Sequence, residues 1–415
     1  MDAFQRSQVR TLVDRLAEHP HHIIAVSGPR QTGKTTLVTQ ALRRCGRPSL
    51  HLRLDEVDAE GVPPSEAEAA LRLPRKPDTE WLVEKWQQAR READGNPCGF
   101  VLALDEIQTI PDWSSTVKGL WDADQAENRQ LHVILLGSAP LLIQSGLTES
   151  LAGRFEPIRV THWSFDEMAD AFDFNLAEYI YFGGYPGSAR FIRDEARWRE
   201  YVLGALVTPN IEKDILAMTR VDKPALLKQL FKVGAEYSGQ ILPYYKMLGQ
   251  LHDAGNATTL ARYLDLLSTA GLLAGLPKFH PSRHRARASS PKLNVFNTAL
   301  LTAGSGYTFA QAQADRSFWG RLVESAVGAH ILNTASRDTQ AHYWRERLME
   351  VDFVLRHGPR TIAIEVKSGQ QIRRLQGLEA FEQKFKPQRA MVVGEGGTPL
   401  EEFFTNPVEH WFDVP

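Results

Sequence analysis

The segment IIAVSGPRQTGKTTLVTQAL, residues 23–42, most restricts the folds open to this chain. Its apolar run, Ile23–Ser27, is typical of a buried parallel strand, and Thr35–Leu42 continues as a helix. The loop between them matches the pattern G-x-x-x-x-G-K-[ST], whose glycines let backbone N–H groups face phosphate oxygens at a helix N-terminus. This strand, loop and helix predict an α/β nucleotide-binding core with a parallel sheet.

The loop predicts binding of ATP together with Mg²⁺. Lys34 would reach the β- and γ-phosphates, and the Thr35 hydroxyl would ligate the metal. The residues expected to contact the nucleotide are Gly28, Pro29, Arg30, Gln31, Thr32, Gly33, Lys34, Thr35 and Thr36.

A second buried strand supplies the acid that such a site needs. In GFVLALDEIQTI, the apolar run Val101–Leu104 ends at Asp105, which would hold Mg²⁺ at the carboxyl end of the strand. Glu106 would orient or deprotonate the attacking water. A third strand, LHVILLGSA, ends in Ser138, whose hydroxyl would sense the γ-phosphate.

In TESLAGRFEPIRV, Arg154 follows a glycine in a short polar break. A guanidinium there could stabilise charge on a transferring phosphoryl group, either within its own chain or in a neighbouring chain of a homo-oligomer. A surface arginine in a turn is the other interpretation, and the sequence leaves both open. From Phe165 to Asp214 the pattern is mostly helical, which predicts a lid packed on the nucleotide core.

Residues 221–292 predict a winged helix. Two strands, LLAGLPKF and PKLNVF, flank the basic loop PSRHRARASS, with Arg283, Arg285 and Arg287 as candidate phosphate contacts. A solvated basic loop without a ligand is the alternative. Three short helices with tight connections are expected before the strands, at Pro224–Tyr237, Tyr244–Leu251 and Thr258–Thr269.

Near the C-terminus, EVDFVLRHGPRTIAIEVKSG predicts a hairpin of two alternating strands. A turn centred on Gly358–Pro359 sets Asp352 opposite Glu365. Proline fits a two-residue primed turn badly, so we expect a loop of four residues with the same register. Because strand side chains alternate, Lys367 joins these two acids on one face. The apolar residues expected on the other face are Phe353, Ile364 and Val366.

Carboxylates gathered on one strand face repel one another unless a cation lies between them. Asp352 and Glu365 are oxygen ligands of the kind that Mg²⁺ or Mn²⁺ prefers, and Lys367 would position the attacking water or neutralise developing charge. Glu324, in an otherwise apolar helical segment, could add a further acid. The alternative is an exposed sheet face with cross-strand Asp–Lys pairs.

Length and composition limit the number of domains, the extent of any nucleic-acid surface and the compartment expected for this chain. At 415 residues the chain is long enough for several domains, and its net charge of −2 confines any nucleic-acid surface to local patches. Two cysteines, Cys45 and Cys98, without a paired framework fit a reducing cytoplasm. We expect neither a signal peptide nor a membrane span, because no apolar run approaches 18 residues.

Taken together, these motifs resemble prokaryotic AAA-type ATPases that carry a C-terminal DUF4143 domain. The matching signatures are GPRQTGKTT, LALDEIQTIPDW, LLGSA, ESLAGRFE, SFDE, YFGGYP, PKLNVFNTAL and EVDFVL with IAIEVKSG. The resemblance implies an ATPase core at 1–162, a helical lid at 163–220, a winged-helix-like domain at 221–295 and a PD-(D/E)xK nuclease-like domain at 296–415.

Within that resemblance, Asp352, Glu365 and Lys367 match the D…ExK core, and Glu324 matches the preceding helical acid. Two positions depart from the family pattern: His162-Trp163 stands where Pro-Leu is common, and Asn297 stands where Asp is common. Two functions remain open. One is ATP-driven binding or processing of DNA by a metal-dependent nuclease-like domain; the other is a nucleotide-controlled switch whose terminal domain only binds DNA or a protein partner.

Overall fold

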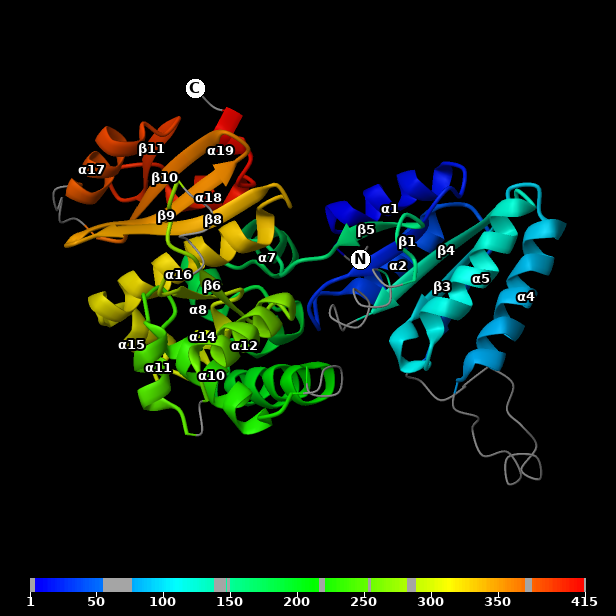
Figure 1. Ribbon diagram of the computed structural model, residues 1–415, viewed down its shortest axis with the longest axis horizontal. Helices are drawn as coiled ribbons and strands as arrows, with labels where there is room; N and C mark the ends of the chain where they lie inside the picture. The colour runs from blue at the N-terminus through cyan, green and yellow to red at the C-terminus, as the bar shows by residue number, and fades with distance from the viewer. Residues whose placement is uncertain are drawn as a thin grey trace. The chain divides into compact units, whose positions relative to one another are not determined.

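The chain divides into two units, residues 1–160 and 161–415 (Figure 1). Among the helices that can be described, none is long and apolar enough to cross a membrane. The computed structural model describes residues 4–54, 77–137, 147, 150–215, 221–252, 255–281, 289–369 and 375–413.

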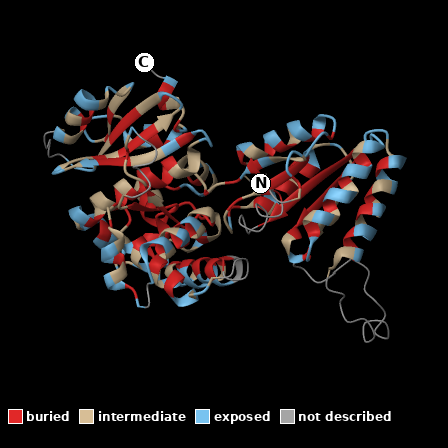
Figure 2. Ribbon diagram, in the orientation of Figure 1, coloured by how far each residue is buried: buried red, intermediate tan, exposed pale blue. Residues whose placement is uncertain are grey.

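The first unit is built on a parallel sheet of five strands in the order β2-β3-β4-β1-β5. Its three central strands are buried over most of their length (Figure 2), as their apolar runs predict. The two edge strands are mostly half-buried or exposed, so they lack such a run and were not predicted. The strands are β1 (Ile23–Ser27), β2 (Ser49–Arg53), β3 (Phe100–Asp105), β4 (Leu131–Gly137) and β5 (Phe155–Arg159).

Helices cover both faces of this sheet. One apolar cluster includes Leu12 and Val38 from α1 and α2, and the other includes Trp86 and Trp121 from α4 and α5. The buried Asp124 carboxylate also accepts hydrogen bonds from Trp86 Nε1 and Arg90 Nε, both at 2.7 Å, which ties α5 to α4. The helices are α1 (Ser7–Ala17), α2 (Lys34–Arg44), α4 (Thr79–Gly95) and α5 (Trp113–Ala126), with a 3₁₀ turn at Ile107–Thr109.

The second unit begins with the helices of the segment predicted as a lid. These helices pack on α14 (Ala299–Thr302), α16 (Arg316–Thr334) and α18 (Leu400–Thr405), all within the same unit. The segment contains α7 (Phe165–Phe172), α8 (Leu176–Phe182), a 3₁₀ turn (Pro186–Phe191), α9 (Glu195–Glu200) and π-helical stretches at Tyr201–Val207 and Asn210–Ile215. The domain boundaries at 162, 220 and 295 stay predictions.

Three helices and a two-stranded antiparallel sheet follow, close to the expected positions. The basic residues Arg283, Arg285 and Arg287 lie outside the described residues. The elements are α10 (Pro224–Glu236), α11 (Tyr244–Gln250), α12 (Ala257–Thr269), β6 (Leu273–Leu276) and β7 (Lys292–Val295).

A second sheet, of order β11-β10-β9-β8, forms the C-terminal part of this unit. The pairs β8–β9 and β9–β10 are antiparallel, and β11 is parallel to β10. The elements are α15 (Phe309–Ala314), β8 (Thr339–Glu346), β9 (Met349–His357), β10 (Arg360–Lys367), α17 (Gln376–Phe385), β11 (Arg389–Gly394) and α19 (His410–Asp413). The predicted fold class, a parallel-sheet nucleotide core with an additional C-terminal sheet domain, is confirmed.

The β9–β10 hairpin has the predicted register but a shorter loop. Arg360 pairs with His357 and Ile364 with Phe353, so the loop is the two residues Gly358–Pro359 rather than four. Gly358 has a φ of +58°, and the proline ring fixes a negative φ at the next position. This sign pattern is that of a type II′ turn, which accepts proline second, so the prediction that proline fits a two-residue primed turn badly holds for type I′ but not for type II′.

Strand β9 also contains a bulge. Its partner β8 pairs Trp344 with Val351 but His342 with Val354, so two steps along β8 oppose three along β9. Val351 and Val354 consequently lie in the same apolar cluster, with Trp344 and Phe381. A bulge of this kind turns the side chains of its extra residue away from the regular alternation, here at 352–353.

Within the second unit, His330 of α16 is buried, and its Nε2 lies 2.8 Å from the Asn406 carbonyl oxygen. Burial lowers the pKa of His330 to about 4, although the hydrogen bond opposes this shift. The folded chain therefore keeps the imidazole neutral. The unfolded chain, with an ordinary pKa near 6.5, takes up a proton as the pH falls.

We expect this difference to make the second unit less stable in mild acid. Stability from neutral His330 is intact above pH 6.5 and is lost as pH falls toward 4, by about 2 kcal/mol at pH 5. His330→Gln keeps a donor for the carbonyl but cannot titrate. Urea unfolding at pH 7.5 and pH 5 should show a smaller pH-dependent loss in the variant; equal losses would contradict the assignment.

Candidate functional site

The phosphate-binding loop connects the carboxyl end of β1 to the first turn of α2. A Cβ at Gly28 would lie 1.8 Å from the Val160 carbonyl oxygen, so the loop passes the end of β5 more closely than any side chain allows. Gln31 and Gly33 have φ values of +60° and +85°. Alternating backbone handedness of this kind turns successive N–H groups inward, which suits an anion.

Side chains hold this loop in place. The buried Lys34 ammonium donates to the carbonyl oxygens of Gly28 and Pro29, at 2.9 and 2.7 Å. Thr32 Oγ1 also donates to the Pro29 carbonyl, at 2.9 Å. Arg6, which precedes α1 and was not predicted, is buried and donates from Nη1 to the Thr32 carbonyl oxygen at 3.3 Å. Both Lys34 and the loop backbone are thus pre-positioned.

The two predicted magnesium ligands lie together. Thr35 Oγ1 donates a hydrogen bond to Asp105 Oδ2 at 2.6 Å. Thr35 follows β1 and Asp105 ends β3, and β4 lies between these two strands in the sheet. The two residues still meet, because the carboxyl ends of parallel strands lie on the same side of the sheet. His51 of β2, absent from the prediction, has Nε2 4.0 Å from Asp105 Oδ2. Burial, and then the charge of Arg53, lower the pKa of His51, so the imidazole adds no positive charge at neutral pH.

Glu106 directly follows the buried Asp105. Its φ is +59°, a backbone conformation that residues other than glycine rarely adopt, and its carboxylate accepts a hydrogen bond from Gln108 Nε2. Strained backbone of this kind is found preferentially at functional sites. Ser138, the predicted γ-phosphate sensor, lies outside the described residues.

Arg154 lies at the amino ends of the strands, opposite the ends that carry the phosphate-binding loop. Its carbonyl oxygen accepts from Ile23 N at 2.9 Å, at the amino end of β1, whereas the phosphate-binding loop leaves the carboxyl end. The guanidinium forms a two-pronged pair with Asp122, at 2.7 and 3.0 Å, and this pair lowers the pKa of the Asp122 carboxyl. The fold therefore does not bring Arg154 to the loop of its own chain. Action on a neighbouring chain stays a prediction.

In the second unit, an acidic cluster surrounds a lysine that the sequence analysis missed. Lys292 begins β7, and its side chain is 0% exposed. Its Nζ lies 2.5 Å from Glu324 Oε1, 3.3 Å from Asp352 Oδ1 and 3.9 Å from Glu350 Oε1. It also lies 4.9 Å from the centre of the Phe353 ring. Asp352 and Phe353 thus both border Lys292 at the bulge, while Phe353 still pairs with Ile364, with which it was predicted to share a face.

The D…ExK residues also lie near one another. Asp352 Oδ2 accepts from the Val366 backbone N–H at 2.8 Å, between Glu365 and Lys367 in the sequence. Lys367 Nζ donates to Glu365 Oε1 at 2.6 Å. Among the described residues, no group of three or more His, Cys, Asp or Glu side chains is arranged to hold a metal ion. The metal proposed for Asp352 and Glu365 stays a prediction.

The protonation of the cluster follows from burial and charge. Burial and the Asp352 charge raise the pKa of Glu324 to about 8, and Lys292 opposes this rise. Burial and the Asp352 charge likewise raise the pKa of Glu365 to about 7, against the effect of Lys367. Burial alone would lower the pKa of Lys292, but the charges of Glu324 and Asp352 outweigh it, so the pKa rises and the ammonium stays protonated.

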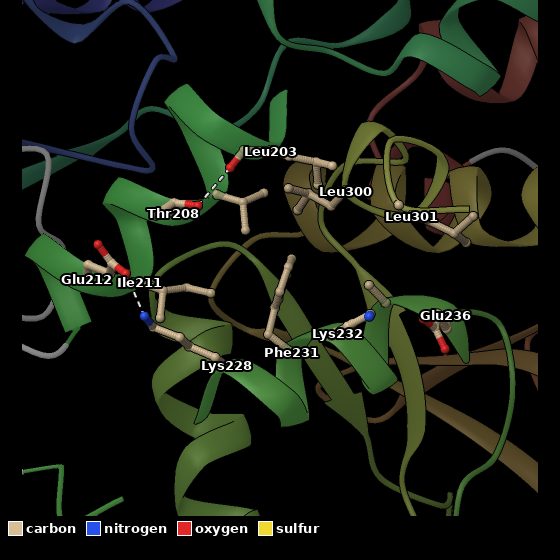
Figure 3. A pocket seen from close by; sticks show the side chains of 13 residues that line it. Leu203, Thr208, Ile211, Glu212, Lys228, Phe231, Lys232, Glu236, Leu300 and Leu301 are labelled. Atoms are coloured by element: carbon tan, nitrogen blue, oxygen red, sulfur yellow. Dashed lines mark hydrogen bonds and ion pairs between the residues drawn. The ribbon is translucent and has the colours of Figure 1, made fainter. Parts of the chain in front are cut away.

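The cavities lined by described residues of the second unit include two of contrasting chemistry. One, of about 1010 Å³, is lined by Glu324 together with Arg316, Arg321 and Asp315, so it gives access to one side of the acidic cluster. The other, of about 430 Å³, lies between the π-helical stretches, α10 and α14, and its lining is mostly apolar (Figure 3). Lys228 and Glu212 form an ion pair of 2.5 Å in this second cavity. The acidic cluster therefore adjoins the polar cavity, not the apolar one.

Comparison with known proteins agrees with this geometry. The model of the family described as AAA domain matches residues 20–169, and that of the domain of unknown function DUF4143 matches residues 319–408. The chain is an AAA-type P-loop ATPase with a C-terminal DUF4143 domain. Between these two, a domain of unknown function, DUF8612, matches residues 173–310.

Individual relatives carry less information on function. This ATPase is 25% identical over 361 residues to the uncharacterized proteins Rv2008c of Mycobacterium tuberculosis and Mb2031c of Mycobacterium bovis, which covers 85% of the chain and 72% of each relative. Among solved structures it is similar to the Walker-type ATPase paby2304 of Pyrococcus abyssi. That match has 17% identity and a TM-score of 0.49, and it covers 73% of this chain and 96% of the other.

The two departures from the family pattern contact each other in this ATPase. His162 Nε2 lies 2.9 Å from the Gly271 carbonyl oxygen, an acceptor, so Nε2 must carry the proton and Nδ1 must accept. Asn297 Nδ2 lies 3.3 Å from that Nδ1 and is its donor. Asn297 Oδ1 accepts from the N–H groups of Gly184 and Ala299, both at 3.2 Å. An aspartate here could not donate to a neutral His162.

Asn297→Asp should therefore destabilise the second unit by about 2 kcal/mol or more, because it removes a buried donor and adds a buried charge. Urea unfolding at pH 7.5 measures the loss. Asn128→Asp is the matched control, since Asn128 is exposed and the same change should cost little there. An Asn297→Asp variant as stable as the control would show that the His162–Asn297 contact does not stabilise the fold.

Proposed function

We propose that this ATPase hydrolyses ATP at the loop 28–36 and uses the cycle to control how its second unit binds DNA. The observation that carries the first part is the 2.6 Å contact between Thr35 Oγ1 and Asp105 Oδ2. A hydroxyl and a carboxylate oxygen at this spacing suit Mg²⁺, which prefers oxygen ligands. Bound there, Mg²⁺ would neutralise charge that builds up on the phosphates.

The remaining roles follow from position. When ATP binds, the Lys34 ammonium would give up its hydrogen bonds to the two loop carbonyl oxygens and donate to phosphate oxygens instead. Glu106 would accept a proton from the attacking water or orient it. Arg154, at the far edge of its own sheet, would act only on the nucleotide of a neighbouring chain, which makes a homo-oligomer part of the proposal. Ser138 keeps the predicted role of γ-phosphate sensor.

The proposal of DNA as partner rests on the middle of the second unit. Three helices followed by the antiparallel pair β6–β7 have the order of a winged helix, and the segment with Arg283, Arg285 and Arg287 connects the two strands. In this arrangement the arginines would contact backbone phosphates and supply affinity without reading sequence. A protein partner is the alternative ligand for the same unit.

For the C-terminal domain, the contacts of Lys292 favour binding without cleavage, because a protein cation already neutralises the acids. Metal-dependent DNA cleavage is the second candidate function. It is supported by the proximity of Asp352 to the Glu365–Lys367 pair across the hairpin. The choice depends on whether Mg²⁺ or Mn²⁺ can enter the cluster.

The ATPase assignment is tested at the loop. We expect Lys34→Ala to weaken ATP binding, and Glu106→Gln to keep binding but lower kcat on the order of 100-fold or more. Steady-state ATPase rates and nucleotide binding measure the two effects. Lys118→Ala, at an exposed position of α5, is the control and should behave as wild type. Wild-type turnover in both Lys34→Ala and Glu106→Gln would contradict the assignment.

Binding to DNA and cleavage are separated by a second experiment. The full chain is incubated with ATP and Mn²⁺ on single-stranded, duplex and branched DNA. We expect DNA binding whose affinity falls as the salt concentration rises, and no cleavage. Replacing Arg283, Arg285 and Arg287 with Ala should weaken this binding and make its salt dependence less steep. Cleavage that vanishes in Asp352→Ala and Lys367→Ala would establish the second candidate instead. Unchanged binding in the arginine variant would remove the winged helix as the DNA contact.

A further inference from the structure

Lys292 is the most deeply buried charge of the acidic cluster. Fully buried lysines occur almost only where acids pair with them, and here three carboxylates from two other elements lie within 3.9 Å of Nζ. Glu324 comes from α16, and Glu350 and Asp352 come from β9. The Asp352 backbone carbonyl oxygen adds a fourth acceptor, at 3.2 Å. The ammonium is therefore surrounded by oxygen atoms much as a metal ion would be.

The carboxylate oxygens expected to bind a metal are already engaged. Asp352 Oδ1 faces Lys292, and Asp352 Oδ2 accepts from the Val366 N–H. Glu365 Oε1 accepts from Lys367, and Glu324 Oε1 faces Lys292. In the part of the chain that the structure describes, Glu365 Oε2 is the remaining buried oxygen of the D…ExK pair without a hydrogen-bond partner. Of the Asp352–Glu365 pair, a metal ion would thus find one buried carboxylate oxygen that is not already hydrogen-bonded within the protein.

We propose that the Lys292 ammonium is the resident cation of this cluster, and that the wild-type chain consequently binds no divalent metal there. A second cation at the same carboxylates would meet the repulsion of a buried ammonium that cannot move into solvent. Lys292 lies in the segment matched by DUF8612, and the acids lie in the segment matched by DUF4143. The cation thus comes from outside the motif that holds the acids. The inference is independent of ATP hydrolysis in the first unit.

Metal binding gives the most direct test. The full chain, free of nucleotide, carries Thr35→Ala so that the phosphate-binding loop contributes no metal ligand from this residue. Bound Mn²⁺ is counted by electron paramagnetic resonance, with and without Asp352→Asn. We expect the same count in both proteins. One additional Mn²⁺ per chain that disappears with Asp352→Asn would overturn the proposal, whatever the result of the ATPase assay.

Substitution of the lysine gives an independent test. Lys292→Met keeps the length of the side chain and removes its charge, so the acids lose their partner. Lys228→Met is the matched control, because its ammonium also lies 2.5 Å from a carboxylate, that of Glu212, but both side chains are 47% exposed. We expect the drop in melting temperature to be several times larger for Lys292→Met than for Lys228→Met.

A double variant distinguishes loss of charge balance from loss of packing. Lys292→Met with Glu324→Gln removes the lysine and its nearest acid together, and should recover at least half of the melting temperature lost in Lys292→Met alone. The double variant also tests the proposal if Lys292→Met alone does not fold, because recovery of folding would then be the expected result. A Lys292→Met chain no less stable than the control, or a double variant without recovery, would overturn the role of Lys292 as counter-charge.

Discussion

A charged side chain that leaves water needs an opposite charge or several hydrogen bonds, and both candidate sites are built on this requirement. In the AAA domain, Lys34 donates to two loop carbonyls and Asp105 accepts from Thr35. In the second unit, Lys292 is held between acids of α16 and β9. The Lys34 contacts lie within the loop motif itself, whereas the Thr35–Asp105 contact and the Lys292 contacts join segments far apart in the sequence. These long-range contacts are tertiary, and a single short motif supplies only one side of each.

This explains which features could be predicted. The phosphate-binding loop, the helices before β6 and the hairpin register depend on short-range patterns, and all were predicted closely. Edge strands β2 and β5 lack the apolar run that identifies a buried strand. Arg154 could not be placed without the strand order, because a residue just before β5 lies at the amino edge of a parallel sheet. Lys292 looks like an ordinary polar residue in KLNV, and its burial depends on elements that follow it in the chain.

The structure explains the two departures from the family pattern, at His162 and Asn297, by a contact between them. Asn297 stands where the family commonly has Asp, so this position carries no charge. Its amide instead donates to His162, the other departure, and its oxygen accepts two backbone N–H groups. The two residues thus form one hydrogen-bonded pair. Neither is among the residues whose contacts form the acidic cluster, and neither is an argument for or against chemistry there.

A D…ExK pattern on a hairpin determines which acids lie together but leaves open which cation neutralises them. The same three residue types, here Asp352, Glu365 and Lys367, could surround a metal ion in one protein and lie beside an ammonium group in another. The distinction is made by a residue outside the motif, and it can be recognised from burial: a lysine with 0% exposure has no access to water as an alternative partner. Once Lys292 occupies that position, the acids stabilise the junction of β7, α16 and β9, and the cluster becomes part of the core that supports the neighbouring cavity.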